Sequence, residues 1–251
     1  AKYTFMVANL PHCLREELES LPWLFRMLYL LSVKFADRIT VQTKEQQDLF
    51  EANFEIHAPI VPNGIPVPPI EESPDDFSFD FIWVASFKVQ KRADKLIEIA
   101  QILPHRRFLV VGGPGQDERY SQELMERVQD LPNVDYRGFV TPDKVGAIYR
   151  LGRIYLNTSD WEGFPNGFLY AWSRGIPACS LHIDPDLAVT GLGLGLVDPD
   201  PLALATSMDE LLNDSDRYRA MGARCYEHVT LNHSLDRTVD TFISILPSQD
   251  V

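Results

Sequence analysis

The sequence has few cysteines, no excess of positive charge and no long apolar run. Its three cysteines, Cys13, Cys179 and Cys225, lie far apart and form no CxxC pair, which argues against a zinc or redox centre. We therefore expect reduced thiols, in the core or at the surface, in a cytoplasmic protein. The formal net charge of −13 repels a phosphate backbone, so nucleic acid is not an expected partner and any anionic ligand must be bound by local groups.

The most apolar segment, residues 21–33, is too short to span a bilayer and contains Arg26. We expect a buried helix that packs on a neighbouring element, with a helix at a membrane surface as the alternative. The six histidines show no HxxxH spacing, so no metal site is predicted.

The first 69 residues have the pattern of half an α/β unit. Residues 2–7 and 38–42 are expected strands, residues 21–35 an expected helix, and Thr43 with Gln46 signals the start of another helix. Residues 61–69 are dense in proline and glycine, which excludes a helix interior or a central strand. We place a domain boundary there, with an incomplete domain over residues 1–69 and a second domain over residues 70–251.

From residue 79 onward, strand and helix patterns alternate with short connections. We expect strands at residues 79–85, 108–111, 134–136, 154–157, 178–181 and 194–197. We expect helices at residues 93–102, 116–131, 142–151, 166–174, 201–212, 215–229 and 234–246. This order predicts an α/β fold with a Rossmann-like, doubly wound parallel sheet, in which ligands bind outside the carboxyl ends of the strands.

The most informative segment, residues 159–177, reads SDWEGFPNGFLYAWSRGIP. It predicts a strand end, a turn and a helix, with Pro165 in the first helical turn and Gly175 at the helix end. Backbone N–H groups around Asn166 and Gly167, at the positive end of the helix dipole, favour a phosphate. Glu162 is a loop carboxylate beside this turn; alternatively it is a helix-end charge that only complements the dipole.

A signature segment and four further segments, which come in the family's order, resemble glycosyltransferase family 4 (group 1), the retaining GT-B enzymes that use nucleotide-sugars. Glu-Gly-Phe-Pro-Asn at residues 162–166, with the closing Gly-Ile-Pro, resembles the family's donor-site signature. The other segments are ADRI with Gln-Thr (residues 36–39 and 42–43), VPNG (residues 61–64), and the pair WVASFKVQKR and NVDYRGFV (residues 83–92 and 133–140). The resemblance implies a donor-binding domain preceded by a remnant of the N-terminal, acceptor-binding domain. It leaves open a peripheral membrane contact through the missing part.

The resemblance also implies roles for individual residues. Glu162 would bind hydroxyls of the donor sugar as the catalytic residue, and Lys91 would bind the diphosphate together with Lys88 and Arg92. The remaining implied donor contacts are Gly163, Phe164, Pro165, Asn166 and Gly167 for sugar and phosphate, and Phe139 and Val140 for the base. Neither a metal nor a cofactor is implied, so the cations and the helix dipole would stabilise the departing diphosphate.

Two positions depart from the family pattern. Tyr170 stands where the family usually has a second glutamate that contacts the ribose, and Ser86 stands where it often has an arginine. Tyr170 is either a ribose contact through its hydroxyl or a helix residue that packs on the sheet.

The function expected from these residues is retaining, metal-independent transfer of a hexose-type sugar in the cytoplasm. The donor is a nucleoside diphosphate sugar, and the acceptor is a glycan, a lipid or a small molecule. The alternatives are a nucleotide-sugar binding module without catalysis and a sugar-nucleotide epimerase. The base, the sugar, the acceptor and the oligomeric state stay open.

Overall fold

The computed structural model describes residues 3–69 and 77–246, which form two compact units. Unit 1 consists of Ala1–Pro66, Glu162–Pro165 and Asn232–Val251, and unit 2 consists of Val67–Trp161 and Asn166–Leu231. The segment 162–165 and the last helix, both expected in the second domain, are grouped with the first unit. Residue 70, the expected start of the second domain, lies outside the described residues, so that boundary stays a prediction.

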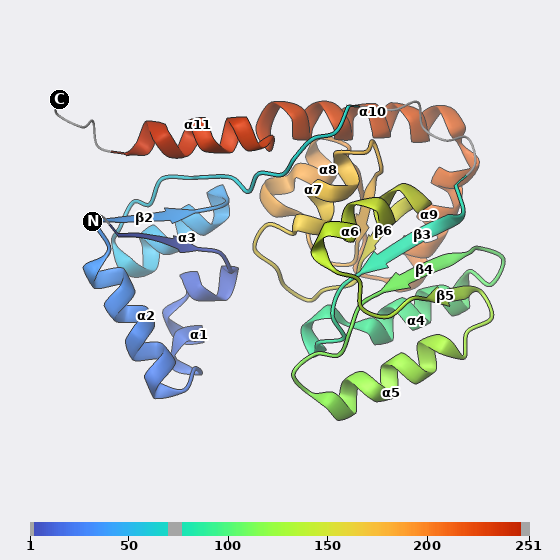
Figure 1. The fold of residues 1–251 in the computed structure, drawn as a ribbon, viewed down its shortest axis with the longest axis horizontal. Helices are drawn as coiled ribbons and strands as arrows, with labels where there is room; N and C mark the ends of the chain where they lie inside the picture. Colours follow the sequence, from blue (N-terminus) through green and yellow to red (C-terminus); the bar gives the residue numbers. More distant parts are fainter. Residues whose placement is uncertain (1–2, 70–76, 247–251) are drawn as a thin grey trace. The chain divides into compact units, whose positions relative to one another are not determined.

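Unit 2 is built on a sheet of six parallel strands in the order β5-β4-β3-β6-β7-β8 (Figure 1). The strands are β3 (Phe79–Val84), β4 (Phe108–Val111), β5 (Val134–Tyr136), β6 (Gly152–Asn157), β7 (Ala178–Ser180) and β8 (Gly195–Val197). All six expected strands are confirmed, with ends within two residues of the expected ones. The order runs outward from β3 in one direction and from β6 in the other, which confirms the doubly wound sheet.

Helices cover both faces of this sheet. They are α4 (Ala93–Ile102), α5 (Glu118–Gln129), α6 (Pro142–Ile148), α7 (Asn166–Trp172), α8 (Ala188–Gly191), α9 (Pro201–Asn213) and α10 (Ser215–Asn232), with the 3-10 turns η2 (Val89–Lys91), η3 (Tyr149–Leu151) and η4 (Pro185–Leu187). Because crossovers between parallel strands are right-handed, α4 and α5 lie on one face and α6 and α7 on the other (Figure 1).

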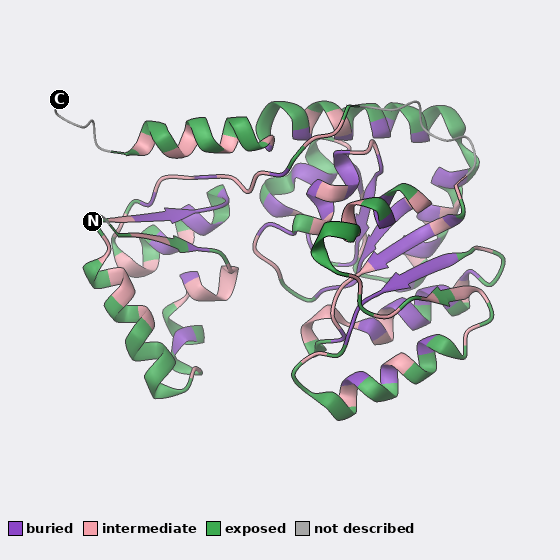
Figure 2. Ribbon diagram, viewed as in Figure 1, coloured by how far each residue is buried: buried purple, intermediate pink, exposed green. Residues whose placement is uncertain are grey.

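The core of unit 2 is the sheet itself, buried between these two helical layers. Figure 2 shows β3 and β4 mainly in the colour of buried residues. Phe81 and Leu109 on these strands, and Trp172 on the covering helix α7, are each 0% exposed. A near-continuous apolar run in each central strand is what burial on both faces requires.

Unit 1 has only two described strands, β1 (Thr4–Val7) and β2 (Arg38–Val41), which pair in parallel. Its other elements are η1 (Leu10–Cys13), α1 (Arg15–Glu19), α2 (Trp23–Phe35), α3 (Lys44–Phe54) and α11 (Leu235–Ile245). The expected cap is confirmed, because the Thr43 side chain accepts a hydrogen bond from the Gln46 amide at 3.1 Å. The part of the expected first strand before residue 3 lies outside the described residues.

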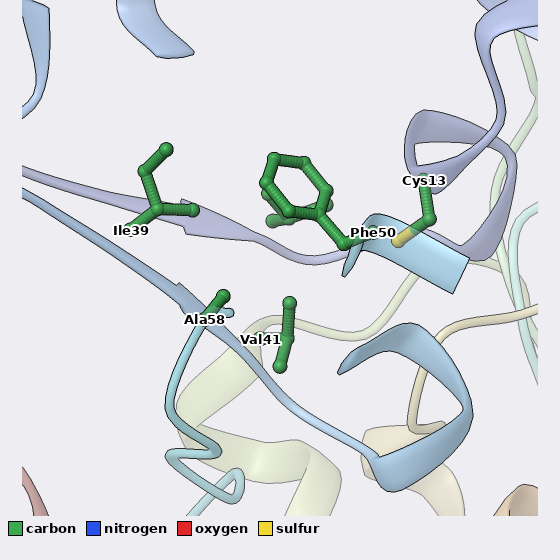
Figure 3. Close-up of a cluster of buried hydrophobic side chains, with 6 residues drawn as sticks. Cys13, Ile39, Val41, Phe50 and Ala58 are labelled. Carbon is green, nitrogen blue, oxygen red and sulfur yellow. The ribbon is translucent and has the colours of Figure 1, made fainter. Parts of the chain in front are cut away.

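A small hydrophobic cluster holds unit 1 together. Phe50 of α3 lies among side chains from β2 and from the segments that flank the strands, as Figure 3 shows. Its other buried members are Val7, Cys13, Ile39, Val41 and Ala58. All three cysteines of the chain are free and buried, as the core-filling expectation requires.

Helix α2 contradicts the expectation of a buried helix. It has no buried residue, and Trp23, Phe25 and Phe35 are 74%, 64% and 67% exposed. Apolar residues occur all around this helix, and the two-stranded sheet offers too small a surface to cover them. In the described parts of the chain, no helix combines the length and apolarity needed to cross a membrane.

Candidate functional site

The site is built at the point where the strand order of unit 2 changes direction, between the neighbouring strands β3 and β6. In open α/β sheets the loops that leave two such strands run to opposite sides, and the crevice between them is the usual ligand site. The loop after β3 contains Lys88, Lys91 and Arg92, and the loop after β6 contains residues 158–161. The loop with the three predicted cations and the loop that leads to the signature segment therefore lie at the same sheet edge.

Close packing of the backbone shapes the loop after β3. A side chain on Gly112, which follows β4, would place its Cβ 1.7 Å from the carbonyl oxygen of Ala85. Phe87 is fully buried and anchors the loop. Lys88 is exposed at the start of η2, and Lys91 is half-buried at its end.

The loop after β6 is held by hydrogen bonds of its hydroxyl and backbone amide groups. The Thr158 hydroxyl accepts a hydrogen bond from Trp83 Nε1 at 2.9 Å and donates one to the carbonyl oxygen of Lys91 at 2.7 Å. The Asp160 amide donates to the carbonyl oxygen of Gln90 at 2.9 Å. The backbone that carries Lys91 is thereby joined to the loop that leads to Glu162 in the sequence.

Arg92 has a different environment from the two lysines. It adopts a left-handed backbone conformation, with φ 48° and ψ 53°, and its guanidinium contacts Asp94 at 2.8 Å and Asp160 at 2.9 Å. The hydrogen bonds to Asp94, against the opposing effect of burial, raise the pKa of Arg92 further above its ordinary range. The guanidinium predicted to bind phosphate thus already faces two carboxylates.

Helix α7 follows the signature segment and is shorter than expected, ending at Trp172. Gly167 fits its position because an added Cβ would lie 2.3 Å from the hydroxyl of Tyr155. Asn166 is exposed, and Tyr170 is half-buried. The ring of Tyr170 stacks on that of Tyr149 in η3, with centroids 5.6 Å apart and planes 23° apart, and the ribose contact of its hydroxyl stays a prediction.

The predicted base-binding residues lie in the turn that follows β5. Gly138 has φ 66°, and its carbonyl oxygen accepts a hydrogen bond from the Gly112 amide at 2.9 Å. This turn presents Phe139, which is 72% exposed, and the half-buried Val140. An added Cβ on Gly113 would lie 3.3 Å from Phe139 Cβ, so Phe139 borders the glycine-rich turn after β4.

The four residues of the signature that belong to unit 1 are fixed by other residues of that unit. The Phe164 amide donates to Gln42 Oε1 at 3.4 Å, and Asn63 Nδ2 donates to the Phe164 carbonyl oxygen at 3.2 Å. The Phe164 ring lies 4.7 Å from that of His233, measured between centroids. An added Cβ on Gly163 would lie 2.0 Å from the carbonyl oxygen of Ala8.

Beside these supports, Glu162 is half-buried and Pro165 is buried. Gln42, Asn63 and His233 were not predicted as part of the site. Asn63 and Gln42 did fall in segments that resembled the family, but His233 gave no signal, because its contacts reach back about 170 residues to Asn63.

Comparisons with known proteins identify the family and the fold. A family model described as glycosyl transferases group 1 matches residues 78–214, more than half of the chain. The chain is 24% identical over 163 residues to a phosphatidylinositol N-acetylglucosaminyltransferase subunit of Arabidopsis thaliana, an alignment that covers 61% of this chain and 36% of that protein.

Solved structures share the fold at low sequence identity. Anabaena HepE in complex with UDP and glucose matches with a TM-score of 0.80 and 16% identity, over 98% of this chain and 72% of that one. The pneumococcal O-GlcNAc transferase GtfA in complex with UDP and GlcNAc matches with 0.73 and 18%, over 97% and 52%. Staphylococcus aureus TarM in complex with UDP matches with 0.76 and 15%, over 97% and 50%. The fold is that of GT-B glycosyltransferases, and the chain spans about half of the GtfA and TarM chains.

Proposed function

Because the chain belongs to the group 1 glycosyltransferases, we propose that unit 2 binds a nucleoside diphosphate sugar and that the protein transfers the sugar with retention of configuration. The transfer needs no metal ion in this proposal and takes place in the cytoplasm. The sugar is of the hexose type, and the acceptor is a glycan, a lipid or a small molecule. The Arabidopsis relative is named for phosphatidylinositol, which favours a lipid acceptor.

The observation that carries the proposal is the pairing of two loops at the change in strand order. The loop with Lys88 and Lys91 is hydrogen-bonded to the loop that continues into the donor signature. A ligand at this edge meets cations from one loop and backbone groups from the other, as a sugar diphosphate requires. The HepE, GtfA and TarM structures contain UDP, which supports the same class of donor here.

Each predicted residue has a chemical task in this reaction. As the bond to the leaving group breaks, negative charge grows on the diphosphate, and Lys91 with Lys88 stabilises it. Backbone groups from Gly163 to Gly167 hold the sugar and the phosphates, and Glu162 binds sugar hydroxyls. Phe139 and Val140 border the base.

Donor binding can be tested by calorimetry with UDP. We expect Lys91→Ala to weaken UDP binding by about tenfold or more, since a charge-assisted hydrogen bond to phosphate contributes roughly 1.5–3 kcal/mol. Lys95→Ala is the matched control, because Lys95 lies on α4 and pairs with Glu98 at 2.7 Å. Equal UDP affinity in wild type and Lys91→Ala would remove Lys91 from the site.

Catalysis is tested with Glu162→Ala in a full-length enzyme that includes the rest of the acceptor-binding domain. We expect transfer to be abolished while UDP still binds, because Glu162 acts on the sugar and not on the nucleotide. Normal turnover by this variant would refute the role of Glu162.

The second candidate is a nucleotide-sugar binding module without catalysis. It is favoured by Tyr170, whose ring stacks on Tyr149 where the family usually has a glutamate. This candidate predicts UDP-sugar binding with neither transfer nor slow hydrolysis, even in a full-length protein. Detection of released sugar by product analysis would rule it out.

A further inference from the structure

Arg92 connects two loops that are far apart in the sequence. Its Nε and Nη2 donate to the two oxygens of Asp94 at 3.0 and 2.8 Å, and its Nη1 donates to Asp160 Oδ1 at 2.9 Å. Asp94 follows on the same loop and helix, whereas Asp160 lies on the loop after β6. The guanidinium fork is suited to such a bridge, because its planar donors can serve two carboxylates at once.

The charges around Arg92 are unfavourable for a diphosphate. One guanidinium faces two carboxylates, so these three groups together carry net negative charge. A phosphate placed on Arg92 would have to displace a carboxylate that is already hydrogen-bonded. The side chains of this cluster are partly exposed, with exposed fractions from 30% for Arg92 to 40% for Asp160. The cluster therefore borders solvent.

The backbone of Arg92 also indicates a structural demand. Its left-handed conformation, φ 48°, is one that glycine adopts without strain and a long side chain does not. The conformation turns the chain from η2 into α4 directly after Lys91. An arginine at such a position offsets the strain through the contacts of its side chain.

Three further hydrogen bonds join the same two loops beside Arg92. They run from the Thr158 hydroxyl to the Lys91 carbonyl, from the Asp160 amide to the Gln90 carbonyl, and from Gln90 Nε2 to the Trp161 carbonyl at 3.5 Å. To these hydrogen bonds Arg92 adds an ion pair with Asp160 at 2.9 Å. It therefore helps to fix the spacing of the loop that carries Lys91 and the loop that leads to Glu162.

We propose that Arg92 is a positioning residue and not a phosphate ligand: through Asp160 it holds the loop after β3 against the loop after β6, and so places Lys91 for the diphosphate of the donor. This proposal rests on the proposed function, because it deepens the role of the same donor site.

The test compares four variants of the 251-residue chain: Arg92→Gly, Arg92→Lys, Asp160→Ala and the control Arg137→Ala. Glycine suits the left-handed backbone, so Arg92→Gly removes the side chain without new strain. Arg137 pairs with Asp135 at 3.0 Å on β5, so its loss removes a comparable surface ion pair elsewhere in unit 2. Affinities for UDP and for uridine are measured by calorimetry, and amide exchange at Asp160 is measured by hydrogen–deuterium exchange.

Whether Asp160→Ala weakens or strengthens UDP binding distinguishes a positioning role of Arg92 from a role as phosphate ligand. If Arg92 positions the loop, Asp160→Ala weakens UDP binding by about fivefold, the size expected for loss of an exposed charged pair. This weakening occurs although a negative charge has been removed, and uridine binding is unchanged. If Arg92 is a phosphate ligand, Asp160→Ala frees the guanidinium and tightens UDP binding, which overturns the proposal.

Arg92→Lys gives a second, independent comparison. Lysine keeps the charge but cannot bridge two carboxylates with the same geometry, so we expect UDP affinity as low as in Arg92→Gly. Retention of wild-type UDP affinity by Arg92→Lys would overturn the proposal.

The exchange measurement does not depend on donor binding. Both Arg92→Gly and Asp160→Ala should speed exchange of the amide at position 160 by about fivefold, with unchanged exchange in β3 and in Arg137→Ala. Unchanged amide exchange in both variants would show that the contact of Arg92 with Asp160 does not hold the two loops together, which overturns the proposal. If the wild-type protein binds neither UDP nor any other nucleoside diphosphate, the proposed function is refuted, and the role of Arg92 in placing Lys91 for the donor is refuted with it. Faster amide exchange in the two variants would still show that Arg92 joins the two loops.

Discussion

The two units of this chain differ in how completely they bury their apolar side chains. In unit 2, six strands lie between helical layers, and Phe81 and Trp172 are fully buried. In unit 1, the buried apolar side chains form one small cluster around two strands, and neither α2 nor α11 has a buried residue. Since burial of apolar area is the main favourable term in folding, we infer that unit 2 is the more stable part.

The donor signature belongs to both kinds of environment. Its helix α7 is packed in unit 2, whereas Glu162–Pro165 are grouped with unit 1. The loops with the predicted phosphate-binding and base-binding residues thus follow strands of a sheet buried on both faces, while the predicted sugar-binding carboxylate depends on the more sparsely packed unit. Substitutions in the two units should therefore differ in their effects.

Removal of a large side chain should separate the two units most clearly. Trp172→Ala in unit 2 should lower the free energy of unfolding by about 3–5 kcal/mol, because the ring is 0% exposed and its Nε1 donates to the Leu194 carbonyl at 3.2 Å. Trp23→Ala on α2, where the ring is 74% exposed, should change it by less than about 0.5 kcal/mol. Urea unfolding followed by circular dichroism measures both values, and similar losses in the two variants would contradict the comparison.

Glycine-to-alanine substitutions test how far the backbone of each unit can shift to make room for a methyl group. Gly112→Ala meets the Ala85 carbonyl at 1.7 Å in unit 2, and Gly163→Ala meets the Ala8 carbonyl at 2.0 Å in unit 1. We expect a loss of roughly 3 kcal/mol for Gly112→Ala and about 1 kcal/mol for Gly163→Ala, because the sparsely packed unit can shift. Gly191→Ala is the control, since its nearest neighbour would be 3.6 Å away. A larger loss for Gly163→Ala would show that unit 1 is the more rigid.

The buried cysteines report on local opening. Burial raises the pKa of Cys13 and of Cys179 to about 12, so at pH 8 both are protonated thiols and react only after the surrounding structure opens. Cys13 in unit 1 should react with N-ethylmaleimide roughly tenfold faster than Cys179 in unit 2. Timed labelling with peptide mass spectrometry measures the rates; equal rates would mean that the two units open together.

Substitutions of charged surface residues should change the free energy of unfolding least. In unit 2, hydrogen bonds from Arg106 lower the pKa of Asp209. Its stabilising contribution is therefore complete above the ordinary carboxyl pKa of about 4 and is lost as the pH falls below it. Asp209→Asn should lower stability at pH 7 by about 1 kcal/mol or less and reduce its dependence on pH below 5.

The corresponding pair in unit 1 is more exposed. Lys44 and Asp48 are each 60% exposed, so Asp48→Asn should leave stability nearly unchanged at pH 7. Thermal unfolding of both variants at pH 7 and pH 4 measures the difference. A larger effect for Asp48→Asn would contradict the ranking of the two units.

Sequence reasoning predicted unit 2 well because its signals are local. Apolar strands, capping residues, and the turn-forming Pro165 and Gly175 each act within a few residues, and the alternation of strand and helix that they mark predicts a doubly wound sheet. Lys91 and the loop after β6 could be placed at one sheet edge for the same reason.

The failures have a physical cause in common, which is dependence on distant partners. The apolar pattern of α2 predicted burial, but no pattern within residues 21–33 states how much surface is available to cover it. The prediction that Arg92 binds phosphate is untested, but its contact with Asp160, 68 residues later, is of the kind that a local pattern does not reveal. His233 and the grouping of Glu162–Pro165 with unit 1 depend on contacts of the same long range.

The way the signature segment leaves one unit and returns to it has a consequence for protein engineering. The backbone passes from one unit to the other at residues 66–67, 161–162, 165–166 and 231–232. Four peptide bonds therefore connect the two units. A graft or truncation made at residue 69 would keep the Glu162–Pro165 bend but discard Gln42 and Asn63, which hold Phe164. Exchange of donor specificity between relatives should therefore transplant these supporting side chains along with the sheet.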